Sequence, residues 1–277
     1  MASAVVFAYH DVGVRCLSVL LAGGVDVKRV VTHRDDPNEN VWFASVEKLA
    51  RRHGVDVAYD ESAAPGAPDF IFSFYYRHML PAPVLASARR GAYNMHGSLL
   101  PKYRGRVPVN WAILHGERET GATLHEMVEK PDAGRIVDQM AVPILPDDLA
   151  IDVFRKVTVA AELVLHRSLP SILDGSVRPR AQDLAKGSYF GGRKPEDGRI
   201  DWSKPAADIH NLVRAVAPPY PGAFCDVDGR RLIIHRTRML PRTEGGGAAG
   251  IERTGDGFTA RGGDGGRLAI LEWEWAK

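Results

Sequence analysis

Two side chains with different chemical abilities stand two positions apart within residues 91–105. Asn94 offers an amide that donates hydrogen bonds, and His96 offers a titratable imidazole. If residues 92–95 form a strand that ends here, both side chains leave the same face of a sheet. Gly97 and the glycine- and proline-containing run after it predict a loop at the carboxyl end of that strand, where open α/β sheets bind ligands. We therefore expect a reacting group to be held above this pair.

A carboxylate follows in a second turn-rich segment. A histidine at a strand end is, taken alone, more often structural than catalytic. Asp132, in residues 127–134, changes that interpretation because its loop can reach the same cleft. A carboxylate beside an imidazole favours the imidazolium. His125, on the strand expected before this loop, is predicted to pack or to form hydrogen bonds rather than to react.

The composition is that of an ordinary soluble protein of 277 residues, with 45% hydrophobic and 25% charged residues and a formal net charge of +2. This charge is too small to indicate nucleic-acid binding by itself. The two cysteines, Cys16 and Cys225, lie far apart and have no zinc-site spacing, so we expect no metal and a reducing compartment. The apolar N-terminal run is too short for a signal peptide, and no window is long enough to span a membrane. A cytoplasmic location is expected.

The first half of the chain alternates between strand-like and helix-like patterns. Buried strands are predicted by apolar runs at residues 4–9, 27–32, 55–59 and 69–74. Helices are predicted by leucines at helical spacing after Cys16, by an amphipathic stretch at residues 41–53 that includes Trp42, and at residues 83–88. This order predicts a Rossmann-like, mostly parallel sheet with helices on both faces. The first strand-to-helix turn, residues 9–14, lacks the glycine spacing that holds a dinucleotide, so NAD is not expected.

Downstream, residues 108–116, 150–173 and 206–216 are predicted helices, and residues 121–128 and 136–143 are predicted strands on either side of the aspartate loop. Five short strand-like runs after residue 223 predict a small OB-like β-barrel. The Gly245–Gly247 tract predicts a flexible loop. We therefore predict three parts: a catalytic domain at residues 1–185, a linker and helix at 186–222, and a C-terminal β domain at 223–277.

These residues resemble the formyltetrahydrofolate-dependent formyltransferase superfamily, whose hallmark is Asn-x-His-x-Ser-x-Leu-Pro-x-x-[Tyr/Trp]-Arg-Gly followed by a later aspartate. The matching positions are Asn94, His96, Ser98, Leu100, Pro101, Tyr103, Arg104, Gly105 and Asp132. Within the superfamily the chain is most similar to the formyltransferases that act on UDP-4-amino-4-deoxy-L-arabinose. That likeness covers essentially the whole chain and includes Phe72–His78 and Pro221–Phe224.

The resemblance implies a reaction in which an amine of a nucleotide-linked amino sugar takes the formyl group of N10-formyltetrahydrofolate. Asn94 would stabilise the tetrahedral oxyanion. His96, as imidazolium, would assist and protonate the leaving N10, while Asp132 holds the ring in place and favours its protonated form. If the acceptor is the arabinose derivative, the product would serve lipid A (lipopolysaccharide) modification and antibiotic resistance to cationic peptides.

The same resemblance assigns binding residues. For the folate it implies His78, Met79, Leu80, Arg106, Val128, Glu129, Lys130 and Pro131. For the phosphates of the sugar nucleotide, Lys102, Arg104 and Arg193 are the candidates, because cationic side chains pair with phosphate oxygens.

Other functions stay open at this level. A methionyl-tRNA formyltransferase shares the motif, but the C-terminal segment mixes basic and acidic side chains, so nucleic acid is not the expected partner. The acceptor could be another nucleotide-linked amino sugar. From a different class, the chain could be a non-catalytic folate- or nucleotide-binding protein, although the intact Asn94, His96 and Asp132 argue against this. The sequence leaves open the sugar, the oligomeric state and whether a separate dehydrogenase acts in the same pathway.

Overall fold

The computed structural model describes residues 1–37, 39–60, 66–241 and 247–276. Gly245 and Gly246, from the tract predicted to form a loop, lie outside the described residues. The chain divides into two compact units. The first contains Met1–Arg106, Thr120–Val142 and Arg155–Phe190, and the second contains Val107–Glu119, Pro143–Phe154 and Gly191–Lys277. The three-part division at residues 185 and 222 stays a prediction.

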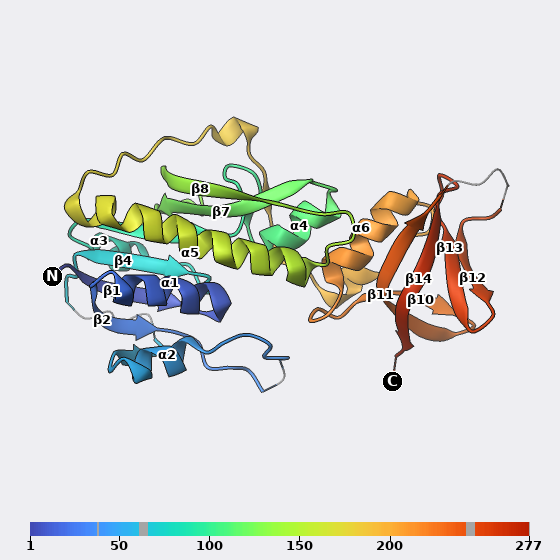
Figure 1. The fold of residues 1–277 in the computed structure, drawn as a ribbon, viewed down its shortest axis with the longest axis horizontal. Helices are drawn as coiled ribbons and strands as arrows, with labels where there is room; N and C mark the ends of the chain where they lie inside the picture. The colour runs from blue at the N-terminus through green and yellow to red at the C-terminus, as the bar shows by residue number, and fades with distance from the viewer. Residues whose placement is uncertain (38, 61–65, 242–246, 277) are drawn as a thin grey trace. The chain divides into compact units, whose positions relative to one another are not determined.

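The first unit is built on a seven-stranded sheet with the order β3-β2-β1-β4-β5-β7-β8 (Figure 1). Strands β3, β2, β1, β4 and β5 run parallel, and β7 runs antiparallel to β5. This confirms the predicted Rossmann-like, mostly parallel architecture. The strands are β1 (Ser3–Ala8), β2 (Asp26–Val31), β3 (Asp56–Ala58), β4 (Phe70–Phe74), β5 (Gly91–His96), β7 (Glu119–Glu126) and β8 (Ile136–Pro143).

Helices cover both faces of this sheet. Helix α1 (His10–Ala22) and helix α5 (Ala150–Asp174) lie together, since Arg15 of α1 pairs with Glu162 of α5 at 3.3 Å. On the opposite face, Val84 and Leu85 of α3 (Ala82–Ala86) pack against a core cluster that contains Val5, Phe7, Val31, Ile71 and Leu80. All five residues of β4 are buried, as expected for a strand covered on both sides.

One predicted helix begins later than expected. The amphipathic pattern over residues 41–53 predicted a helix that includes Trp42, but α2 spans Val46–Arg52. Ser45 ends the extended chain there, because its hydroxyl accepts the N–H of Lys48 as an N-cap. Trp42 lies before the helix and contacts the ring of His10 edge-on, with 4.5 Å between ring centroids. The prediction for this segment was therefore wrong at its N-terminal end.

The second unit combines short helices with a small sheet. Its five strands form one antiparallel, curled sheet with the order β10-β11-β14-β13-β12, as visible in Figure 1, and this confirms the predicted small β domain. The elements are α4 (Pro108–Leu114), the 3₁₀ turn η3 (Pro195–Gly198), α6 (Ala206–Val216), β10 (Ala223–Val227), β11 (Arg230–Leu240), β12 (Gly250–Thr254), β13 (Gly257–Arg261) and β14 (Arg267–Trp275).

Two further short strands belong to the first unit. Strand β6 (Arg104–Gly105) pairs in parallel with β9 (Tyr189–Phe190), which follows the 3₁₀ turn η2 (Leu184–Lys186). Among the described residues, no helix combines the length and apolar character needed to cross a bilayer.

Candidate active site

Strand β5 carries Asn94 and His96 on the sheet face that α3 covers. Ala92, two residues before Asn94, packs against the core cluster on that face, so the alternation of the strand places Asn94 and His96 there too. Tyr93 and Met95 are buried and point the other way. His96 itself is only 7% exposed. The sheet therefore fixes the two polar side chains at neighbouring positions.

The loop after β5 is tied down by side-chain hydrogen bonds. Ser98 donates its hydroxyl to the carbonyl of Lys102 at 2.7 Å, and Thr123 of β7 donates to the carbonyl of Ser98 at 2.6 Å. Gln139 of β8 donates to the carbonyl of Leu100 at 2.8 Å. These contacts bind the loop to two strands of the sheet and hold its later backbone groups at fixed positions.

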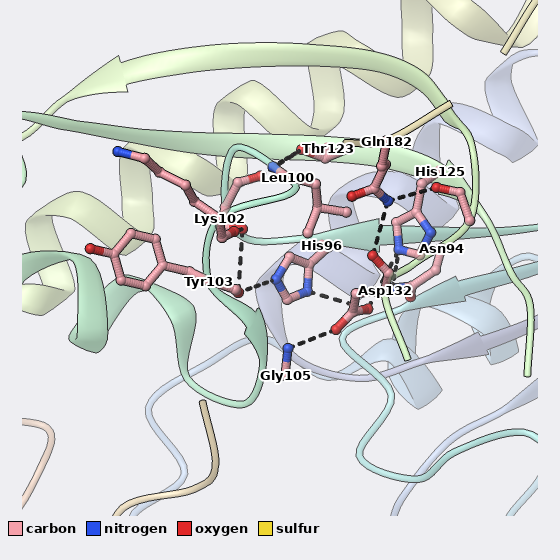
Figure 2. A network of polar contacts seen from close by, with 12 residues as sticks. Asn94, His96, Leu100, Lys102, Tyr103, Gly105, Thr123, His125, Asp132 and Gln182 are labelled. Atoms are coloured by element: carbon pink, nitrogen blue, oxygen red, sulfur yellow. Dashed lines mark hydrogen bonds and ion pairs between the residues drawn. The ribbon is translucent and has the colours of Figure 1, made fainter. Parts of the chain in front are cut away.

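One of these backbone groups faces the histidine. The carbonyl oxygen of Tyr103 lies 2.8 Å from Nε2 of His96 (Figure 2). A carbonyl can only accept, so His96 Nε2 carries a proton. The other ring nitrogen, Nδ1, lies 3.6 Å from Oδ1 of Asp132. Both nitrogens thus face acceptors, and the imidazolium is the form of His96 that satisfies both.

Asp132 is held by contacts from two distant parts of the chain. Its Oδ2 accepts the backbone N–H of Gly105 at 2.8 Å, and its own backbone carbonyl accepts from the side chain of Gln182 at 2.9 Å (Figure 2). Gln182 also donates to the carbonyl of Gly134 at 2.6 Å, which closes the loop. Asp132 has a positive φ of 50°, a conformation that aspartate tolerates better than most residues. The carboxylate position is therefore determined by tertiary contacts.

The electrostatics keep this carboxylate charged. Burial alone would raise the pKa of Asp132, but the nearby His96, the neighbouring ring of His125 and the N–H of Gly105 together lower that pKa well below its ordinary value. Its side chain is 14% exposed. The site thus offers a buried negative charge beside an imidazole that has both nitrogens facing acceptors, the arrangement that proton delivery requires.

His125 is a component of the site whose partners the sequence did not identify. It lies directly opposite Asn94 in the β5–β7 register, and its Nε2 is 3.1 Å from the side-chain nitrogen of Asn94 and 3.5 Å from Oδ1 of Asp132. The prediction of a hydrogen-bonding role for His125 is consistent with these contacts. Cross-strand pairing was the only signal that could have indicated its partner, and this requires knowing that the two strands are neighbours.

The segments predicted to bind folate lie on the same sheet face as Asn94. Leu80 is part of the core cluster, and Met127, which precedes the Val128–Pro131 segment, packs against it. His78 and Met79 are exposed, as are Val128, Glu129 and Lys130. Arg106 donates to the carbonyl of Arg77 at 3.5 Å, beside the His78–Leu80 segment. Exposed residues beside the Asn94 face are compatible with a pterin-binding role, which stays a prediction.

The three candidate phosphate contacts differ in their surroundings. Lys102 is exposed, and its side chain extends away from His96 in Figure 2. Arg104 is 8% exposed, and its Nε is buried with no hydrogen-bond partner among the described residues. Arg193 belongs to the second unit, whereas Lys102 and Arg104 belong to the first.

Arg193 lines a pocket of about 260 Å³ in the second unit, together with Val107, Asn110, Lys194, Pro195, Gly198, Val216, Tyr220, Pro221 and Gly222. Its guanidinium lies 4.9 Å from the centre of the Trp111 ring and donates to the carbonyl of Asp197 at 2.8 Å. Burial lowers the pKa of Arg193, and its Nε is buried without a partner among the described residues. The pocket therefore offers a cationic group with spare hydrogen-bonding capacity.

Aromatic rings gather after the carboxyl ends of β1 and β4. His10 has a positive φ of 68° and its ring centroid lies 4.0 Å from that of Phe43. Burial, and then the charge of Arg77, lowers the pKa of His10 to about 3, so this ring is neutral at physiological pH. Strands β1 and β4 are neighbours in the sheet, but the chain continues from β1 toward one sheet edge and from β4 toward the other. Open α/β sheets bind ligands at such a point, beyond the carboxyl ends of the two strands.

Among the described residues, no group of three His, Cys, Asp or Glu side chains is placed to hold a metal ion.

Comparison with known proteins identifies the family. The formyl transferase family matches residues 3–171, and the formyl transferase C-terminal domain matches residues 193–277. Several solved structures share the fold. An N-formyltransferase from Helicobacter canadensis, in complex with folinic acid and dTDP-3-aminofucose, is 22% identical with a TM-score of 0.80, covering 98% of this chain and 99% of its own.

Two other structures are similar. WlaRD, a sugar 3N-formyl transferase solved with dTDP and 5-N-formyl-THF, is 22% identical with a TM-score of 0.79, covering 98% of this chain and 97% of its own. A 4-N formyltransferase from Francisella tularensis is 21% identical with a TM-score of 0.69, covering 84% of this chain and 96% of its own. At this identity the likeness shows a shared fold, whereas the family match extends over more than half of the chain. The chain therefore belongs to the formyl transferase family and is a formyltransferase.

Proposed function

We propose that this enzyme transfers the formyl group of N10-formyltetrahydrofolate to the amino group of a nucleotide-linked amino sugar. The observation that carries the proposal is the cluster of Asn94, His96 and Asp132, in which a neutral amide, an imidazole with both nitrogens on acceptors and a charged carboxylate lie together. Two of the similar structures named above contain a folate together with a nucleotide sugar or a nucleotide, which supports the choice of both substrates.

The reaction assigns one task to each residue. The acceptor amine attacks the formyl carbon, and the side-chain amide of Asn94 donates to the oxyanion that forms. The C–N10 bond then breaks and N10 receives a proton from His96. The proton that the amine nitrogen loses returns to the His96 imidazole, so the proton balance closes. Because the Nε2 proton of His96 is bound to the carbonyl of Tyr103, delivery to N10 requires that this hydrogen bond be exchanged for one to the substrate.

For the acceptor, we propose UDP-4-amino-4-deoxy-L-arabinose, with its place in lipid A modification, on the strength of the sequence resemblance. A dTDP-linked amino sugar is the second candidate, because two of the similar structures contain a dTDP sugar or dTDP. The decisive assay incubates the enzyme with N10-formyltetrahydrofolate and each of several UDP- and dTDP-linked amino sugars, with initiator Met-tRNA as a further acceptor. A formyl mass on one of the sugars supports the proposal. Formylation of the tRNA alone would refute it and would indicate a methionyl-tRNA formyltransferase instead.

The surroundings of Arg104 support its assignment as a contact to the phosphates of the sugar nucleotide. Arg104 is 8% exposed, and its buried Nε has no partner among the described residues, which costs free energy until an acceptor is supplied. A phosphate supplies a charged acceptor. We expect Arg104→Gln to raise KM for the sugar nucleotide about 10- to 100-fold, the usual worth of a charge-assisted hydrogen bond, and to leave KM for the folate nearly unchanged. The exposed Arg52→Gln is the matched control. Equal effects on the KM for the sugar nucleotide and on the KM for the folate would refute the assignment of Arg104 to the nucleotide site.

A further inference from the structure

We propose that His125 is a positioning residue that sets the orientation of the Asn94 amide for formyl transfer. This inference rests on the proposed function, since it assumes that Asn94 stabilises the oxyanion. His125 is 2% exposed and lies on β7, across from Asn94 on β5. Its two ring nitrogens contact groups with different hydrogen-bonding abilities, and these contacts determine which nitrogen carries the proton.

A backbone carbonyl determines the protonation of one nitrogen of the His125 ring. Nδ1 of His125 lies 2.7 Å from the carbonyl oxygen of Glu126, which can only accept, so Nδ1 carries a proton. In the neutral ring Nε2 is then an acceptor, and the atom that faces it at 3.1 Å is the side-chain nitrogen of Asn94. One N–H of Asn94 is consequently bound to His125. The second N–H has a fixed direction and is available to an oxyanion.

The same nitrogen has a second neighbour that would reverse this arrangement. Oδ1 of Asp132 lies 3.5 Å from Nε2 of His125 and 3.6 Å from Nδ1 of His96. If His125 took a second proton, Nε2–H would donate to Asp132 and would no longer accept from Asn94. The amide would have to turn, and one carboxylate would face two imidazolium rings. Formyl transfer therefore requires a neutral His125 beside a protonated His96.

Few charged groups take part in this arrangement. Asp132 from the loop is the carboxylate that contacts the His125 ring, and His96 lies beyond it on β5. On β7 itself, the side chain of Glu126 is held by two hydrogen bonds from Arg135, at 2.6 and 2.7 Å. The distribution of protons between the two histidines is accordingly governed by the single carboxylate that they share.

The kinetic test compares His125→Phe with His125→Gln. Phenylalanine keeps the ring volume and removes the hydrogen-bond acceptor. We therefore expect kcat to fall on the order of 10- to 100-fold, which is less than the loss when an oxyanion donor is deleted. Both KM values should stay within about threefold of the wild type. Glutamine places its carbonyl oxygen near the position of Nε2, accepts from Asn94 and recovers most of the activity. The exposed His166→Phe on α5 is the matched control and retains full activity.

A double-mutant cycle separates positioning from general damage. If His125 acts through Asn94, His125→Phe costs little more once Asn94→Ala is present, because the interaction is already lost. Additive losses, a kcat of His125→Phe within twofold of the wild type, or a Gln variant as slow as the Phe variant would each overturn the proposal.

A substrate-free measurement keeps the inference testable if the Phe variant fails to fold. Nitrogen-15 spectra of histidine-labelled wild-type enzyme at neutral pH report which ring nitrogens carry protons. We expect His125, identified by its loss in the Gln variant, to be protonated at Nδ1 and unprotonated at Nε2. A proton on Nε2 would refute the inference. Failure to formylate any amino sugar would instead refute the proposed function, and the two failures are therefore distinguishable.

Discussion

Replacing Asp132 with asparagine tests the electrostatic part of the site with little change of shape. Asparagine has almost the same volume as aspartate, and its amide oxygen can still accept the N–H of Gly105, which Oδ2 accepts at 2.8 Å in the wild type. The backbone contact from Gln182 does not involve the side chain of residue 132 and is unaffected. We therefore expect Asp132→Asn to keep the loop in place and to leave the KM for folate nearly unchanged.

Turnover is expected to fall steeply, for a reason that the distances make quantitative. The carboxylate oxygen lies 3.6 Å from Nδ1 of His96. Two unit charges about 4 Å apart interact by about 4 kcal/mol at an effective dielectric constant of about 20, which is an upper limit for this pair. Since each 1.4 kcal/mol is about tenfold in rate, Asp132→Asn is expected to lower kcat on the order of 100- to 1,000-fold at neutral pH.

The measurement is steady-state formyl transfer by the wild type and by Asp132→Asn at neutral pH. Near-normal turnover of the variant would refute the assigned role of Asp132.

Two predictions concern stability. Hydrogen bonds from the backbone of Ser3 and from the side chains of Arg89 and Ser3 lower the pKa of Asp69 from 3.8 to about 2. The stabilisation by its carboxylate is therefore complete above pH 3.8 and is lost as the pH falls toward 2. In urea titrations, Asp69→Asn should be less stable than the wild type near neutral pH, and the difference should vanish toward pH 2; a difference that persists there would contradict this linkage. Gly105 has a φ of 96°, and a Cβ atom there would collide with the carbonyl oxygen of Phe190. Gly105→Ala should lower the unfolding free energy by at least about 1 kcal/mol and reduce kcat, because the N–H to Asp132 shifts. Gly257→Ala, at a site with open space, is the control, and equal unfolding midpoints for the two variants would disprove the argument.

The sequence pattern was sufficient to predict the architecture, because the order of strands and helices follows from the periodicity of apolar residues. Apolar runs such as β4, alternating with amphipathic stretches, specify a parallel sheet with helices on both faces, and the short strands after residue 223 specify a small β sheet. The start of α2 was misplaced because Ser45, a local capping residue, ends the extended chain inside an otherwise helical pattern.

The candidate site shows where this kind of prediction stops. The spacing of Asn94 and His96 placed them on one sheet face, since alternation is a property of a single strand. The contacts that give these side chains their protonation states involve residues far along the chain: His125 opposite Asn94, and Gly105 with Gln182 around Asp132. Those partners depend on which strands are neighbours and on how loops close, and both follow from burial of the whole core. The sequence by itself thus determined the chemical groups and the face they share, whereas the tertiary structure decided which nitrogen faces which acceptor.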